Sequence, residues 1–105
     1  MLLDENMPKK LKYRFNDNFE VITVPELGWT GIKNGDLLRK MQTNKLSVLI
    51  SIDKNMSYQQ NLDKFGVSLI VIDVDDGLYK TLVKYIDKIE VCLLDTLEPG
   101  LILIN

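Results

Sequence analysis

The chain of 105 residues contains no histidine and a single cysteine, Cys92, so it lacks the side chains from which most zinc sites are built. One cysteine cannot form an internal disulfide, and without histidine there is no Cys-His nucleophile pair. Any bound metal ion must therefore be held by oxygen atoms. Hard cations prefer such ligands, and this favours Mg²⁺ or Mn²⁺.

The chain also lacks a large excess of charge and any long apolar run. Thirteen Lys and Arg residues face fifteen Asp and Glu residues, for a net charge of −2. This excludes nucleic-acid binding by overall charge but allows a local basic patch. The apolar runs are too short to span a bilayer, and Met1 leads into a strand rather than a signal peptide. We therefore expect one cytoplasmic domain, residues 1–105, with no membrane partner.

Short apolar runs alternate with segments of helical spacing along the whole chain. This alternation predicts an α/β fold in which helices connect the strands of a mainly parallel sheet of four or five strands. The strands are expected at 2–3, 19–24, 47–52, 67–72 and 101–104, and the helices at about 7–16, 34–43, 57–65 and 77–89. Asn6 is expected to cap the first helix, and Asn34 or Asp36 the second.

The apolar segment 101–104 is the least determined of the expected strands. It fits a strand at the edge of the sheet, an antiparallel strand, or a surface buried in a homodimer. Its pattern does not choose among these three.

Asp4 and Asp53 each follow an apolar strand directly or closely. If the first and third strands are neighbours, as at the switch point of doubly wound sheets, the two carboxylates emerge side by side. Two carboxylates about 4 Å apart repel by roughly 4 kcal/mol at an effective dielectric of ~20, and a divalent cation removes this cost. Asp36 approaches from a helix start, where an acid serves equally well as a cap or as a ligand. Such a site favours hydrolysis of a phosphodiester without His or Cys.

Three segments of the chain resemble the small PIN-like domains that are often encoded with toxin-antitoxin partners, and the resemblance covers roughly residues 1 to 74. They are Leu2-Leu3-Asp4-Glu5-Asn6-Met7-Pro8, the loop Glu26-Leu27-Gly28 before the helix with Asp36, and Ser51-Ile52-Asp53-Lys54-Asn55. The resemblance implies a three-layer α/β/α sandwich and a ribonuclease. It also implies Asp4, Asp36 and Asp53 as metal-binding catalytic acids, with Glu5 at the rim and a small antitoxin protein as partner.

The chain departs from this family at two positions. Asn55 stands where relatives often carry an acid, so it offers the metal an amide oxygen without charge. The arginine usual after the fourth strand is replaced by the run Ile72-Asp73-Val74. Both departures bear on activity more than on fold.

Several side chains near the expected site have an ordinary structural role as their alternative. Glu5 is either a metal ligand or a charge at a helix start. Lys9, Lys10 and Lys54 are predicted to contact RNA phosphates, and a solvated surface is the alternative. Trp29 is expected to pack against the second helix rather than stack on a base.

The leading hypothesis is a Mg²⁺- or Mn²⁺-dependent endoribonuclease, the toxin of a toxin-antitoxin pair. A non-catalytic PIN-like module that binds RNA or protein is the first alternative, because Asn55 weakens the ligand set. A receiver-like phosphoacceptor domain is the second, because Asp4-Glu5 and Asp53 also fit that pattern. Against it, no Ser or Thr clearly ends the fourth strand.

Overall fold

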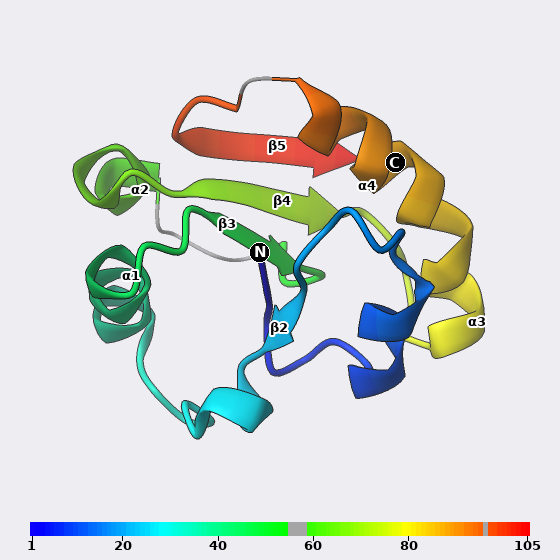
Figure 1. Ribbon diagram of the computed structural model, residues 1–105, viewed down its shortest axis with the longest axis horizontal. Coiled ribbons are helices and arrows are strands. Elements are labelled where there is room, and N and C mark those ends of the chain that lie inside the picture. Colours follow the sequence, from blue (N-terminus) through cyan, green and yellow to red (C-terminus); the bar gives the residue numbers. More distant parts are fainter. Residues whose placement is uncertain (55–58, 96) are drawn as a thin grey trace.

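The computed structural model describes residues 1–54, 59–95 and 97–105, and the side chains of 59–61 are not described. Its five strands form one sheet in which every pairing is parallel, in the order β2-β1-β3-β4-β5 (Figure 1). The strands are β1 (Leu2–Leu3), β2 (Ile22–Thr23), β3 (Val48–Ser51), β4 (Ser68–Ile72) and β5 (Gly100–Ile104). The predicted α/β class with a parallel sheet is therefore confirmed.

The strand order places the topological switch point between β1 and β3. Leu2 pairs with Leu49 and Leu3 with Ile50, so the two strands are neighbours as predicted. In sheets of this order, ligands bind beyond the carboxyl ends of the strands at the switch point. The edge nearest the ends of β1 and β3 is therefore where a functional site is expected.

The helices of the described residues alternate with these strands. They are α1 (Asn34–Thr43), α2 (Gln59–Phe65), α3 (Tyr79–Leu82) and α4 (Ile86–Leu94), with 3₁₀ turns η1 (Lys9–Arg14), η2 (Pro25–Leu27) and η3 (Val83–Tyr85). In Figure 1, α1 and α2 lie at the opposite side of the sheet from α3 and α4. None of the helices in the described ranges is long and apolar enough to cross a bilayer.

Alternate strand residues enter two separate apolar clusters. Leu2, Leu49 and Leu69 pack with residues of α1 and α2, whereas their neighbours Leu3 and Ile50 pack with η1, α3 and α4. This follows from the two-residue period of a strand, which sends successive side chains to opposite faces. Trp29 is half-buried against the first cluster, so its predicted packing role is confirmed.

Several predicted boundaries are wrong, for local reasons. The segment expected as a first α-helix is the 3₁₀ turn η1; Pro8 is its N-cap, and Asn6 does not cap it. The second strand keeps only Ile22–Thr23; on its carboxyl side, Val24 already has helical dihedral angles and is the N-cap of η2. The final helical segment starts at Tyr79, continues to Leu94 and is interrupted by η3. In α1 the N-cap is Lys33, without a side-chain hydrogen bond, so neither Asn34 nor Asp36 caps it.

The C-terminal segment forms an edge strand. β5 pairs with β4 in parallel register, from Ser68 opposite Gly100 to Ile72 opposite Ile104. The antiparallel alternative is therefore wrong, and the homodimer stays a prediction. For the predicted helix at 57–65, residues 57 and 58 lie outside the described residues, and α2 covers the remainder.

Candidate functional site

Asp4 follows β1 and Asp53 lies just after β3, and one hydroxyl group links the Asp4 carboxylate to the Asp53 backbone. The Asp4 amide donates to the Ile50 carbonyl at 2.9 Å, which extends the pairing of the two strands by one residue. The Ser51 hydroxyl donates to Asp4 Oδ2 at 2.9 Å and accepts the Asp53 amide at 3.0 Å. Ser51 thereby fixes the orientation of the Asp4 carboxylate and the position of the Asp53 backbone.

The Asp4 carboxyl group is the most buried acid of this site, with 6% of the residue exposed. Burial raises its pKa above the ordinary value, and the nearby charges of Glu5 and Asp53 act in the same direction. Hydrogen bonds from the Ser51 hydroxyl and the Glu5 amide oppose this rise. The ionised form is thus held by specific donors in surroundings that otherwise disfavour it.

Glu5 follows Asp4 but turns to a different partner. Its Oε2 accepts the backbone N–H of Gly31 at 3.1 Å, and Gly31 has a φ of +83°, a conformation that favours glycine. The side chain therefore ties the loop before α1 to the end of β1. Glu5 is exposed, so it lies at the rim of the site, and its metal role stays a prediction.

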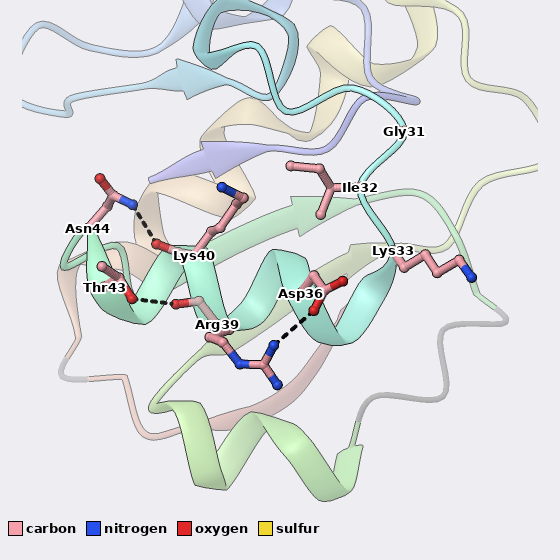
Figure 2. Close-up of a pocket in the computed structure, with 8 residues that line it drawn as sticks. All are labelled: Gly31, Ile32, Lys33, Asp36, Arg39, Lys40, Thr43 and Asn44. Carbon is pink, nitrogen blue, oxygen red and sulfur yellow. Dashed lines mark hydrogen bonds and ion pairs between the residues drawn. The ribbon is translucent and has the colours of Figure 1, made fainter.

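Asp36 lies on the exposed surface of α1 and pairs with a residue of its own helix. Its Oδ1 is 2.9 Å from Nη1 of Arg39, and its side chain is 61% exposed. Figure 2 shows this carboxylate turned toward Arg39 in an open groove along α1. Within the described ranges, no three or more Asp, Glu, Cys or His side chains are arranged to hold a metal ion. The structure thus links the Asp4 carboxylate to the Asp53 backbone through Ser51, and the metal site shared by Asp4, Asp36 and Asp53 stays a prediction.

The predicted RNA contacts have different surroundings. Lys54 is held by Asp73, the residue after β4, with 2.6 Å between Nζ and Oδ1. This hydrogen bond raises the Lys54 pKa. Lys9 and Lys10 are exposed on η1 and line a depression of about 200 Å³. Asn55, the remaining predicted ligand, lies outside the described residues.

Ser51 is the residue that the sequence prediction missed. It is the only hydroxyl side chain within β3, in a run otherwise made of Val48, Leu49 and Ile50, and it is fully buried. A polar side chain at the end of a buried strand needs a hydrogen-bond partner, and the nearest predicted partners were the two aspartates. A single hydroxyl residue at the end of an apolar strand, two positions before an aspartate, is the sequence pattern that identifies Ser51 as a site residue.

Carboxylate oxygens of this kind are the ligands that a hard divalent cation of the magnesium type prefers. Mg²⁺ is usually held by one or two carboxylates, with water and substrate phosphate completing its coordination. Asp4 and Asp53 carry carboxylates at this edge of the sheet; burial is the main cause of the raised Asp4 pKa, and the negative charges of Glu5 and Asp53, which a cation would balance, add to it. The site is thus chemically suited to an ion that also contacts a phosphate group.

Comparison of the chain with models of protein families, with curated proteins and with solved structures gave no match. The resemblance to PIN-like domains therefore rests on the motifs that surround Asp4, Asp36 and Asp53. The function has to be argued from those motifs and from the geometry at the ends of β1 and β3.

Proposed function

We propose that the chain is a Mg²⁺- or Mn²⁺-dependent ribonuclease with a PIN-like, three-layer α/β/α fold. One observation carries the proposal: the buried Asp4 carboxylate lies at the switch point and is joined through the Ser51 hydroxyl to the backbone N–H of Asp53. A structural role alone gives no reason to bury one acid beside others, because their repulsion and the loss of hydration both cost stability. A cation-binding role accounts for both.

In this mechanism the protein positions the Asp4 carboxylate, the Asp53 backbone and the loop at Gly31. Ser51 holds Asp4 Oδ2, so the carboxylate keeps one orientation. Glu5 accepts the backbone N–H of Gly31 and so fixes the position of the loop that precedes α1. A bound divalent ion would lower the pKa of a water molecule and neutralise charge on the phosphate oxygens. Asp4 and Asp53 are the residues that would hold it.

The substrate and partner belong to the proposal through the family resemblance. RNA is the substrate of the nucleases that the motifs resemble, and a small antitoxin protein is the expected partner. Lys9 and Lys10 are proposed phosphate contacts because both are exposed on η1. Lys54 is less suited, since Asp73 already engages its ammonium group.

A second candidate function is a non-catalytic RNA-binding module. The observation that favours it is the position of Asp36, which pairs with Arg39 on the exposed surface of α1. A site with two carboxylates binds an ion more weakly than one with three, and the ion then depends on substrate phosphate. The two functions share a fold and differ in whether RNA is cleaved.

The deciding experiment is cleavage of labelled single-stranded RNA by the purified chain in Mn²⁺ and in EDTA. We expect cleavage only with the metal ion. Asp4→Asn and Asp53→Asn should each reduce the rate by at least the roughly 10–100-fold that loss of a supporting group costs a metal site. Asp87→Asn, which removes an exposed acid in the first turn of α4, is the matched control and should leave the rate unchanged.

Two outcomes would reject the nuclease. Equal cleavage by Asp4→Asn and Asp87→Asn would mean that a contaminant produces the activity. RNA binding without cleavage in either Mg²⁺ or Mn²⁺ would establish the non-catalytic module instead. Circular dichroism of each variant would verify that the fold is retained.

A further inference from the structure

A groove of about 700 Å³ runs along the exposed side of α1, separate from the carboxylate pair. Figure 2 shows its lining residues spread from the loop before the helix to the turn after it. They are Gly31, Ile32, Lys33, Asp36, Arg39, Lys40, Thr43 and Asn44. At about 1.5 Å per residue, the ten residues of α1 give the groove a length of roughly 15 Å.

The charge of this groove is opposite to that of the whole chain. Lys33, Arg39 and Lys40 face it with a single carboxylate, Asp36, whereas the chain carries a net charge of −2. Among the described residues, Lys33 forms no ion pair, and the Lys40 ammonium group lies over the Trp29 ring at 5.7 Å. An aromatic ring attracts a cation without neutralising it. Two positive charges thus remain available to an anionic ligand.

The groove begins beside the proposed catalytic residues. Gly31 lines it and donates its backbone N–H to Glu5, the residue that follows Asp4. A polyanion that lies in the groove and continues past Gly31 therefore reaches Glu5, next to Asp4 at the end of β1. On this basis, and resting on the proposed function, we propose that the groove along α1 binds the sugar-phosphate backbone of single-stranded RNA.

The lining favours a nucleic-acid backbone over an acidic protein segment. Ile32 is its only large apolar residue, whereas protein interfaces depend on buried aromatic or aliphatic anchors. The side-chain donors of Thr43 and Asn44 are used on the Arg39 and Lys40 carbonyls of α1 itself. The free groups are thus mainly cations, which contact phosphate without reading the sequence.

The test measures binding of a fluorescent single-stranded RNA in EDTA, where a metal-dependent reaction cannot proceed. The variant Lys33→Gln/Lys40→Gln is compared with Lys80→Gln/Lys84→Gln, which removes two exposed lysines from α3 and η3. Both variants change the net charge equally. Each phosphate contact contributes about 0.7 to the salt slope of single-strand binding, so loss of two lowers the slope by about 1.4. If the affinities converge at 1 M salt, the groove variant binds about 25-fold more weakly at 0.1 M.

Each outcome bears directly on the groove. Weaker RNA binding and a lower slope in the groove variant alone would support it. Equal losses in both variants, unchanged binding in the groove variant, or no RNA binding by the parent would overturn it. Loss of binding to poly-aspartate with RNA binding retained would assign the surface to an acidic protein. RNA binding at the groove without cleavage in Mn²⁺ would contradict the proposed nuclease activity and still support the groove along α1 as an RNA-binding surface.

Discussion

Asp4 at the end of β1 and Asp36 in the first turn of α1 differ first in exposure. Asp4 is 6% exposed, whereas the Asp36 side chain is 61% exposed. They also differ in their partners, because Asp4 accepts from the buried Ser51 hydroxyl and Asp36 pairs with Arg39 one helical turn away. The pattern of acidic residues in the sequence predicts the same metal-binding role for Asp4 and Asp36. In the structure, the two side chains differ in exposure and in partner.

This difference shows what each kind of element does to an acid at its end. A central parallel strand is covered on both faces, so a residue that extends its pairing remains buried. A helix that packs on one side of a sheet buries one stripe only, and in α1 this stripe is formed by Leu37, Leu38 and Met41. An acid at the end of a central strand therefore loses hydration and needs specific hydrogen-bond donors. An acid on a helix surface remains hydrated and can pair with a neighbouring side chain.

The largest expected difference between the site at Asp4 and the surface at Asp36 is the effect of Mn²⁺ on the free energy of unfolding. An ion at about 100 times its dissociation constant adds about 2.7 kcal/mol to the free energy of unfolding. In a domain of this size 1 kcal/mol moves the thermal midpoint by about 4–8 °C. We expect the parent and Asp36→Asn to show the shift between EDTA and Mn²⁺, and Asp4→Asn and Asp53→Asn to lose it.

The proposed difference between Asp4 and Asp36 is contradicted if Asp36→Asn loses the Mn²⁺-dependent shift of the thermal midpoint, as Asp4→Asn is expected to. Loss of the Mn²⁺ shift in both would mean that Asp36 leaves Arg39 and joins the ion, as the family resemblance implies. Arg39→Ala provides the control, because it frees the Asp36 carboxylate without removing it. A larger Mn²⁺ shift in Arg39→Ala than in the parent would point to the same three-acid site.

The sheet and the neighbouring positions of β1 and β3 were predictable from the sequence because both depend on buried strands. Near-continuous apolar runs such as Val48–Ser51 identify central strands, and connection rules then place β1 beside β3. The ends of neighbouring parallel strands meet at one edge, so the backbones of Asp4 and Asp53 emerge at that same edge. No such rule fixes Asp36, because its direction depends on the rotation of α1 about its axis.

Local boundaries were less predictable because short-range contacts compete with regular structure. The run Lys9–Arg14 has helix-forming residues, but Leu11 is its only buried side chain, and a 3₁₀ turn is enough to place it. Val24 belongs to a β-branched run, yet the following Pro25 starts η2 and Val24 adopts helical angles. In both places the tertiary packing of one or two residues outweighs propensity.

The second effect concerns the hydrogen bonds that support the buried acid. Ser51→Ala leaves Asp4 Oδ2 without its 2.9 Å donor and the Asp53 amide without its acceptor. Loss of a buried partner costs about 1–3 kcal/mol, which chemical denaturation can measure. Thr43→Ala removes the hydroxyl that donates to the Arg39 carbonyl on exposed α1 and should change stability by about 0.5 kcal/mol or less. Equal costs would mean that Ser51 does not support Asp4.

The smallest effect is a pH dependence that has opposite signs at two aspartates. Burial raises the Asp4 pKa, so the folded chain keeps a proton there that the unfolded chain has lost. In EDTA, stability therefore falls as pH rises from the unfolded value of about 3.9 to the raised folded value, and the cost persists above it. Asp4→Asn removes this cost, and its midpoint should exceed that of the parent at pH 7 by a few degrees.

Asp76 provides the opposite case, because it is an exposed acid that accepts the Leu78 amide at 3.0 Å before α3. Hydrogen bonds from Thr81 and from this amide lower its pKa. Its contribution is therefore present above the unfolded value and is lost as pH falls through the folded one. Asp76→Asn should lower the midpoint at pH 7, and both differences should vanish in strong acid. A lower midpoint for Asp4→Asn at pH 7 would mean that its donors outweigh its burial, and the carboxylate would then need no cation.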